Sequence, residues 1–500
     1  MTLVNEAAAP QQLTTHNPVD GTSVARYPLS TAAEVDAAVA RAHSGAAWWK
    51  DLGFAARKAH LLHWKSVMAQ RAPELAEIIS AETGKPASDA VLEVMLTLGH
   101  LDWAAKNAKT VLKRRKVKAG LINYNQHATL GYEPYGVVGV IGPWNYPLYT
   151  PMGSISYALA AGNAVVFKPS ELTPGAAVWI AERWQETIGH DVLQAVPGDG
   201  STGAALAASE VDKIAFTGST ATAKKVMATA AANLTPIVAE CGGKDALLVA
   251  ADADLDSAAD FIVFGSMGNA GQTCVGVERV YVVASVLEAL VSKVKERAAR
   301  IPTAGPDAKY GPMTLPSQVD VVRGHIEAAL QTGTAVLGGP ESIKGRVIEP
   351  VIVTGVAEDS AAVREETFGP VVIINPVSSL DEAVDRANAS SYGLGAAVFT
   401  KDKRAGAAAA ARLEAGAVTI NSVLGFAGVA ALPFGGVKDS GFGRIHGADG
   451  LREFSVTKSI ARQTRKAALN LLTLERTEKD THTAAKMIPM LHGRSKAPRS

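Results

Sequence analysis

A lone thiol is the side chain of this sequence best suited to covalent chemistry. It belongs to Cys274, which ends the segment 269–274 (NAGQTC). Small residues before a thiol leave its sulfur reachable, and a thiol is the most nucleophilic of the uncharged side chains. An isolated cysteine is also commonly an inert, buried residue. The spacing alone supports a covalent catalyst and a packing residue equally.

A carboxylate supplies a second candidate. Glu240 lies in the segment 238–244 (VAECGGK), after an apolar run and before two glycines. This pattern predicts a side chain held at a strand end, where burial raises the pKa of a carboxyl and makes it a general base. The alternative, favoured for Glu240 taken alone, is a surface ion pair with Lys244. Together, Cys274 and Glu240 suggest a thiol nucleophile with a carboxylate that activates water.

Two further segments have side chains suited to a nucleotide. The segment 216–220 (FTGST) follows an apolar run and opens a helical stretch, and helix N-termini bind phosphate; Ser219 adds a hydroxyl. It matches neither the GxGxxG nor the GxxxxGK[ST] pattern. Lys168 and Glu171 follow another apolar run and suit a ribose, because a carboxylate accepts hydrogen bonds from hydroxyls and an ammonium donates them. Two such sites, expected at adjacent strand ends, indicate a dinucleotide more strongly than either site alone.

The elements that position these residues are short apolar runs separated by Ala-rich stretches of helix length. This alternation predicts an α/β protein with a parallel, doubly wound sheet, whose ligands bind at the carboxyl ends of the strands. The first block has runs at 136–141, 163–167, 193–196 and 213–216, and the second at 246–250, 280–283, 371–374 and 396–400. Chemistry is therefore expected just past the first four runs, at 143–145, 168–171, 197–200 and 217–220.

The segment from residue 31 to about 118 has a helical pattern. Thr31 followed by Glu34 is a capping-box signature. The basic run 113–118 (KRRKVK) is interpreted as a solvated helix end rather than a nucleic-acid site.

Composition narrows the class of protein. The chain has 500 residues, 47% of them hydrophobic and 19% charged, with a net charge of +1, so a large core is expected and nucleic acid is not an expected partner. Two cysteines exclude a disulfide scaffold and favour a reducing compartment. The N-terminus has no signal-peptide pattern and no apolar run reaches membrane-spanning length. We therefore expect a multidomain cytoplasmic enzyme without a metal.

Taken together, these segments resemble the aldehyde dehydrogenase superfamily from about residue 14 to 460, in the hydrolytic, non-acylating branch. Seven motifs occur in family order: PWNYP at 143–147, KPSE at 168–171, FTGS at 216–219, ExGGK at 240–244, GQTC at 271–274, EETFGP at 365–370 and PFGG at 433–436. Seven ordered motifs are far more specific than any one of them.

The resemblance implies a role for each motif. Cys274 would attack the aldehyde, Asn145 and the backbone N–H of Cys274 would stabilise the oxyanion, and Glu240 would activate water to release the acid. NAD would bind through residues that the motifs place beside it: Trp144, Lys168, Ser170, Glu171, Gly218, Ser219, Glu366 and Phe368. Phe434 would help to wall the substrate entrance.

The resemblance also separates branches of the family. Members that acylate coenzyme A generally lack the carboxylate at Glu240, so its presence favours hydrolysis; coenzyme A acylation and a non-catalytic structural relative are the alternatives. Glu171 would repel a 2′-phosphate, which favours NAD over NADP, although NADP use is compatible with it.

Some positions depart from the family pattern. Ala223 stands where glycine is frequent, and Cys241 where leucine is usual. Gly268 stands where members that take a carboxylate-bearing aldehyde can have arginine. Arg279 is a second candidate partner for such a carboxylate, with a structural ion pair to Glu278 or another acid as the favoured alternative.

The resemblance implies a Rossmann-like cofactor domain (1–120 and 143–242), an α/β catalytic domain (243–440) and a β-strand oligomerisation arm (121–142 and 441–461). The arm predicts a homodimer or homotetramer. The extension 462–500 carries a net charge of +6, leaving −5 for the rest of the chain. Residues 467–474, beside basic residues, are expected to form an amphipathic helix. Packing on the oligomer or solvation of this tail is favoured over membrane-surface contact.

Overall fold

The computed structural model describes residues 11–120, 122–467 and 469–493. Within this described part, the chain forms two compact units, one of residues 11–111 and 134–456 and the other of residues 112–133 and 457–493. The first unit contains both large sheets, and the second contains most of a smaller sheet.

A six-stranded sheet holds the first block of predicted strands. Its strand order is β21-β9-β8-β5-β6-β7, and all of its strands except β21 are parallel. The bounds are β5 (Val137–Ile141), β6 (Ala164–Lys168), β7 (Leu193–Ala195), β8 (Lys213–Thr217), β9 (Ile237–Glu240) and β21 (Gly441–Phe442). The continuous apolar runs are buried on both faces, as parallel strands covered by helices require. The four predicted runs are confirmed as strands.

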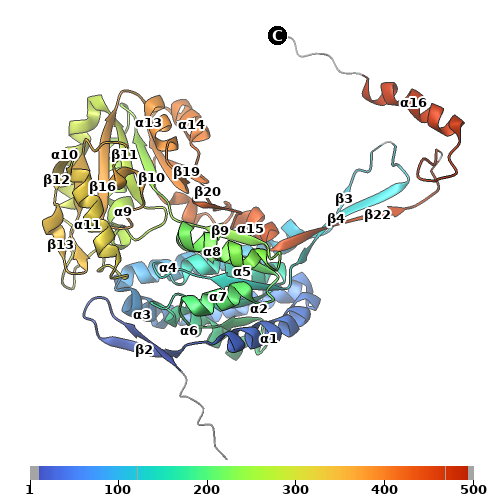
Figure 1. Cartoon of the computed structure of the whole chain (residues 1–500), viewed down its shortest axis with the longest axis horizontal. Coiled ribbons are helices and arrows are strands. Elements are labelled where there is room, and N and C mark those ends of the chain that lie inside the picture. The colour runs from blue at the N-terminus through green and yellow to red at the C-terminus, as the bar shows by residue number, and fades with distance from the viewer. Residues whose placement is uncertain (1–10, 121, 468, 494–500) are drawn as a thin grey trace, which may run out of the picture. The chain divides into compact units, whose positions relative to one another are not determined.

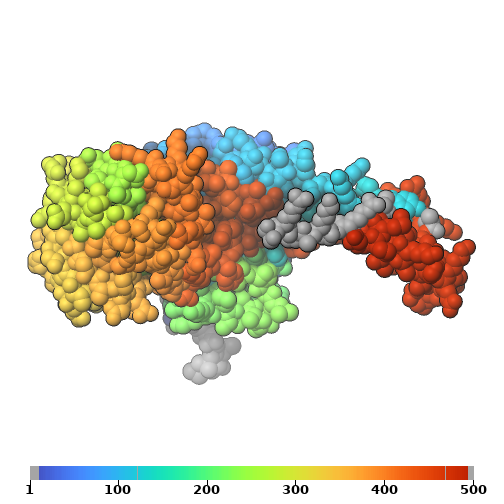
Figure 2. All heavy atoms as spheres, turned by 90° about the horizontal axis from the view of Figure 1, so that it is seen from above, coloured from blue at the N-terminus to red at the C-terminus, as the bar shows by residue number. Residues whose placement is uncertain are grey.

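A seven-stranded sheet holds the second block, in the order β12-β15-β16-β11-β10-β18-β19, with only β12 antiparallel to its neighbour. The bounds are β10 (Asp245–Val249), β11 (Val277–Val283), β12 (Thr334–Leu337), β15 (Val351–Thr354), β16 (Val371–Val377), β18 (Gly395–Phe399) and β19 (Ala417–Ile420). The α/β class and the alternating rhythm are therefore confirmed. In Figure 2 the segments that make this sheet and its helices, lime to orange, gather in one lobe.

Helices surround both sheets (Figure 1). Those of the first block are α1 (Ala32–Asp51), α2 (Gly53–Gln70), α3 (Ala72–Thr83), α4 (Ala87–Leu112), α5 (Tyr149–Ala161), α6 (Gly175–Ile188), α7 (Gly200–Ala208) and α8 (Thr220–Ala231). Those of the second are α9 (Leu255–Met267), α10 (Leu287–Ala298), α11 (Gln318–Leu330), α13 (Leu380–Asn388) and α14 (Lys403–Arg412). No helix of the described residues is long and apolar enough to cross a bilayer.

Local signals set the start and end of these helices. Thr31 and Glu34 form the predicted capping box at α1. The helical pattern was expected to continue to residue 118, but α4 ends at Leu112 and the basic run forms the exposed strand β3 (Arg115–Val117). β3 belongs to a three-stranded sheet with β4 (Gln126–Pro134) and β22 (Ser455–Gln463), in the order β22-β4-β3.

Two sequence-based boundaries are corrected by strand pairing. Residues 137–141, assigned to the arm, form β5 in the middle of the six-stranded sheet because their apolar side chains are buried there. Residues 441–442, also assigned to the arm, form β21, which pairs with β9. The predicted helix at 467–474 is absent from its described residues, and the extension instead forms α16 (Glu478–His492), which begins at a Thr477–Asp480 capping box.

Candidate active site

The carboxyl edge of the six-stranded sheet gathers four of the predicted site segments. Ile141 pairs with Lys168 on one side and Phe216 on the other, and Thr217 pairs with Glu240. Lys168 and Glu240 are the last residues of β6 and β9, and Asn145 and Ser219 lie in the segments that follow β5 and β8. Ligands of doubly wound sheets bind at this edge.

The loop before Cys274 is held in an unusual backbone conformation. Asn269, Ala270 and Gly271 have φ values of 53°, 56° and 70°, in the left-handed region. Two non-glycine residues there cost on the order of 1–3 kcal/mol each, a cost that surrounding contacts must offset. Gly271 is required by space as well, because a Cβ at this position would lie 2.1 Å from the carbonyl oxygen of Gly369.

Hydrogen bonds stabilise this loop. Asn269 Nδ2 donates to the carbonyls of Asn145 (3.3 Å) and Gln272 (3.2 Å). Gln272 Nε2 donates to the carbonyl of Asn269 (2.9 Å), and its Oε1 accepts from the backbone N–H of Thr314 (2.8 Å). Asn269 and Gln272 are therefore held by hydrogen bonds to each other and to the segments of Asn145 and Thr314.

Cys274 and Glu240 line one cavity of about 360 Å³. Glu240 is 3% exposed, and its carboxylate forms no well-aligned hydrogen bond with a described residue. Burial raises the pKa of Glu240 to about 7, against the smaller, opposite effect of the Cys274 and Thr217 side chains, which lie close enough to lower this pKa. Burial, and then the charge of Glu240, raise the pKa of Cys274 well above its usual value. The site therefore holds a thiol beside a carboxyl group that titrates near neutrality.

The surface ion pair considered for Glu240 does not form. Lys244 is buried, and its ammonium binds Glu278 and, at 3.0 Å, the hydroxyl of Thr367. Lys244 is held by Glu278 because both face the interior, whereas Glu240 faces the cavity. Cys241 is a free, buried cysteine and does not line this cavity, so it is a packing residue.

Asn145 is positioned to present its amide. It is 6% exposed, and its Nδ2 donates to the carbonyl of Gln272 at 2.9 Å. An amide nitrogen has two donor hydrogens. The hydrogen bond to Gln272, two residues before Cys274, thus orients the amide of Asn145 and leaves its second N–H free to bind a ligand.

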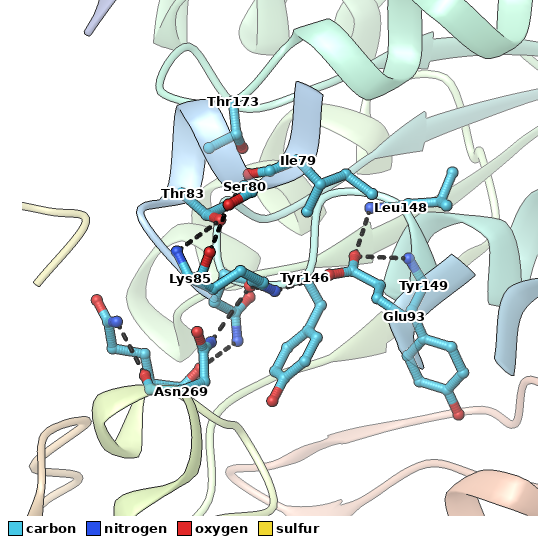
Figure 3. Close-up of polar contacts among 12 residues, drawn as sticks. Ile79, Ser80, Thr83, Lys85, Glu93, Tyr146, Leu148, Tyr149, Thr173 and Asn269 are labelled. Carbon is cyan, nitrogen blue, oxygen red and sulfur yellow. Dashed lines mark hydrogen bonds and ion pairs between the residues drawn. The ribbon is translucent and has the colours of Figure 1, made fainter. Parts of the chain in front are cut away.

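A buried ion pair of Lys85 and Glu93 (Figure 3) also contacts the backbone of Asn145. Lys85 Nζ contacts Glu93 Oε2 at 2.7 Å and donates to the carbonyl of Asn145 at 2.8 Å. Glu93 Oε1 accepts the backbone N–H groups of Leu148 (2.9 Å) and Tyr149 (3.1 Å). Sequence reasoning missed both charges. A pair eight residues apart with 0–1% exposed side chains has no local signature.

Four of the residues predicted to bind NAD lie at the carboxyl ends of β6 and β8, the two strands that flank β5. Lys168 Nζ and Glu171 Oε2 are 3.5 Å apart, with Lys168 buried and Glu171 about half exposed. The Ser170 hydroxyl contacts Glu171 at 3.5 Å. Ser219 caps α8, its hydroxyl accepting from the N–H of Thr222.

Glu366, also predicted to bind NAD, lies against the glycines after Glu240. Glu366 Oε1 accepts the backbone N–H of Gly243 at 2.9 Å, and a Cβ on Gly242 would lie 2.2 Å from its carboxylate. Burial raises the pKa of Glu366 to about 8. The rings of Phe368 and Trp144 meet edge to face at 5.5 Å.

The two residues considered as substrate contacts, Phe434 and Arg279, lie in different places. Phe434 lines the Cys274 cavity and its ring stacks on Phe426 at 5.5 Å. Arg279 is buried and, contrary to the expected pair with Glu278, donates to the carbonyl of Lys244 through Nε (2.9 Å) and Nη2 (2.7 Å). It is not among the residues lining the cavity, so it is not placed to bind a substrate there.

Comparison with known proteins defines the class. The aldehyde dehydrogenase family model matches residues 4–460, and the chain belongs to this family. It is 36% identical over 443 residues to the 4,4'-diapolycopene aldehyde oxidase of Methylomonas sp (88% of this chain, 83% of that one). It is 35% identical over 449 residues to a putative succinate-semialdehyde dehydrogenase [NADP(+)] of Mycolicibacterium smegmatis (88% and 87%).

Solved structures of aldehyde dehydrogenases have the same fold as this chain. An NAD-dependent aldehyde dehydrogenase from Sinorhizobium meliloti superposes with a TM-score of 0.88 at 32% identity, over 93% of this chain and 94% of that one. The protein is therefore an aldehyde dehydrogenase with the fold of that family, and its relatives include both NAD- and NADP-dependent enzymes.

Proposed function

We propose that this enzyme oxidises an aldehyde to the carboxylic acid with NAD, by covalent catalysis on Cys274. The observation that carries the proposal is the cavity shared by Cys274 and Glu240, in which the carboxylate is buried beside the thiol. A buried carboxyl group beside a thiol, with its pKa raised to about 7, is typical of a functional site.

Cys274, Asn145 and Glu240 each act in a different step of the reaction. The sulfur of Cys274 forms a bond to the aldehyde carbon while its proton leaves to a base, giving a thiohemiacetal whose oxygen is stabilised by the free N–H of Asn145. Loss of hydride from that carbon leaves a thioester on Cys274. Glu240 then takes a proton from water as the water oxygen attacks the thioester. The C–S bond breaks, releasing the acid and regenerating the thiol.

The groups at the carboxyl ends of β6 and β8 are suited to bind a dinucleotide. Lys168 and Glu171 offer a donor and an acceptor at the end of β6, and the 12-residue helix α8 presents its N-terminus and Ser219 at the end of β8. Ser170 and Gly218 are next to these groups in sequence, Glu366 binds the backbone of Gly243, and Phe368 and Trp144 contact each other edge to face. When bound, NAD supplies the acceptor for the hydride.

The choice of NAD over NADP depends on Glu171. Its carboxylate is about half exposed, within reach of Lys168, and so can accept from two ribose hydroxyls. A 2′-phosphate at that place would put two anions together. We expect a kcat/KM for NAD at least tenfold above that for NADP.

An assay of products tests the function. Purified enzyme with octanal and NAD should form one NADH and one octanoic acid per turnover, without coenzyme A. Added coenzyme A should leave the acid as the product, because Glu240 directs the thioester to water. Octanoyl-coenzyme A as the main product would contradict the hydrolytic proposal, and absence of NADH formation with any simple aldehyde would contradict the oxidation itself. Repeating the assay with NADP measures the cofactor preference.

We also propose a homodimer or homotetramer that forms through the three-stranded sheet. Its edge strands β3 and β22 expose apolar side chains, with Val117 43% and Ile460 44% exposed, and an unpaired edge is a template for another strand. Light scattering at micromolar concentration should give two or four times 51.9 kDa. A monomer mass would contradict this assembly.

A further inference from the structure

The wall of the cavity at Cys274 carries information about the aldehyde. Its size, about 360 Å³, falls in the range of small-molecule sites and is more than twice that of an engineered cavity that holds benzene. It extends from Cys274 and Glu240 to side chains of several elements of the first unit. These are mostly apolar and include Leu96, Phe264, Val423, Phe426, Phe434 and Ile445.

The charged groups of the wall are already paired or have the wrong sign for an anion. Lys85 is the one lysine or arginine among the described lining residues, and its ammonium is bound to Glu93 and the carbonyl of Asn145. It also lies 4.1 Å above the ring of Tyr146. Asp89 and Glu93 are acids. A substrate carboxylate in this cavity would meet no free cation.

The tyrosine hydroxyls of the wall are also occupied. The hydroxyl of Tyr149 donates to the carbonyl of Ala427 at 2.9 Å, and that of Tyr146 contacts the Thr273 hydroxyl at 3.2 Å. The ring of His446 is buried against the aromatic rings of Phe434 and Tyr149, and burial lowers its pKa well below the usual value, so it is neutral. Both ring nitrogens of His446 lack a hydrogen-bond partner among the described residues, so the wall offers mainly apolar contact area, with one neutral imidazole and no free cation.

The entrance is apolar as well. Leu92 of α4 and Phe264 of α9 both line the cavity, yet they are 40% and 53% exposed. Met95, three residues after Leu92 on the same face of the helix, is 60% exposed. Exposed apolar groups beside a cavity are typical of a ligand-binding site.

We infer that this enzyme acts on uncharged aldehydes with an extended apolar body, a hydrocarbon chain or ring system, and rejects aldehydes that carry a carboxylate. This inference rests on the proposed function, since it assigns the substrate class of the same cavity. The aldehyde carbon would lie at Cys274 and the apolar body along Tyr149, Phe426 and Phe434.

Gly268 offers a way to alter this selectivity. It lines the cavity at the end of α9 with a φ of −55°, which any residue can adopt. A Cβ there would meet nothing closer than a carbon of the Phe264 ring at 4.0 Å. Gly268→Arg would therefore add a cation to the apolar wall, and Gly268→Met would add similar length without charge.

The test compares kcat/KM for three aldehydes with NAD: octanal, butanal and succinate semialdehyde. Each added methylene that is buried should raise kcat/KM by up to ~4-fold, so octanal should exceed butanal by at least ~10-fold. Butanal should exceed succinate semialdehyde, which has the same chain length with a carboxylate, by at least ~100-fold, since that charge would be left without a partner. Equal use of butanal and succinate semialdehyde, or no gain with chain length, would overturn the inference.

The Gly268 variants and a binding measurement complete the test. Gly268→Arg should raise kcat/KM for succinate semialdehyde at least tenfold, and Gly268→Met should not; a gain in both variants would contradict the charge argument. Calorimetry with the wild-type enzyme should detect 1-octanol but not 4-hydroxybutanoate, alcohols with the corresponding carbon skeletons. If no aldehyde yields NADH, the proposed function fails, and these two alcohols still decide the chemistry of the cavity.

Discussion

Replacement of Cys274 by alanine should abolish NADH formation, with kcat lower by at least ~10⁴-fold at unchanged folding. The side chain is the only thiol among the described residues lining the cavity with Glu240, so its removal eliminates the covalent intermediate. The free energy of unfolding should change little, because Cys274 is partly exposed and loses one atom. Steady-state kinetics and a thermal melt measure the two effects.

Cys241→Ala is the matched control. The second cysteine is buried and adjacent to Glu240 in sequence, but it does not line the cavity, and burial raises the pKa of its thiol to about 12. Its replacement should leave kcat within a few fold. Retention of more than one tenth of the activity in Cys274→Ala, or equal losses in both variants, would contradict the assignment of Cys274 as nucleophile.

The strands and the placement of the site were predictable because they depend on local patterns. A continuous apolar run bounded by glycine or proline, such as 136–141, identifies a buried parallel strand, and β5 begins one residue later at Val137. Since the carboxyl ends of parallel strands share an edge, residues after separate runs could be placed together. Lys168, Ser219 and Glu240 follow this rule.

Contacts between distant segments were not predictable in the same way. Lys244 was weighed as a partner of Glu240 because the two are close in sequence, but tertiary burial pairs it with Glu278. Arg279 likewise binds carbonyls rather than an acid. The tail helix was expected at 467–474 from its leucines, whereas the capping box at Thr477 starts it later. Composition indicates helical potential, and capping determines where the helix begins.

Charges inside the site were the least predictable feature. Lys85 and Glu93 are hydrophilic residues that a pattern assigns to the surface, yet their side chains are almost fully buried. They satisfy each other and three backbone groups, those of Asn145, Leu148 and Tyr149. A buried ion pair of this kind is tolerated only where each charge also has hydrogen bonds, and only the folded structure shows those partners.

Glu240→Gln should separate the two halves of the reaction. The amide keeps the shape of the carboxyl group but cannot accept a proton from water, so the thioester should form and then persist. We expect a burst of about one NADH per active site, followed by a steady state slower by ~10²–10³-fold. Rapid-mixing absorbance measures the burst, and the intact mass of the mixed enzyme should increase by the acyl group less one hydrogen. Glu288→Gln, at an exposed carboxylate of α10, is the control and should show neither effect.

The pH dependence follows from the pKa of Glu240, which burial raises to about 7. Only the ionised carboxylate accepts a proton, so acid release by the wild-type enzyme should increase with pH through about 7 and then level off. Below that pH the rate should fall by about tenfold per unit, in proportion to the ionised fraction. The slow phase of Glu240→Gln should lack this limb, because an amide does not titrate. An unchanged limb in the variant would assign the base to another group, and the absence of a burst together with normal turnover would remove Glu240 from the hydrolytic step.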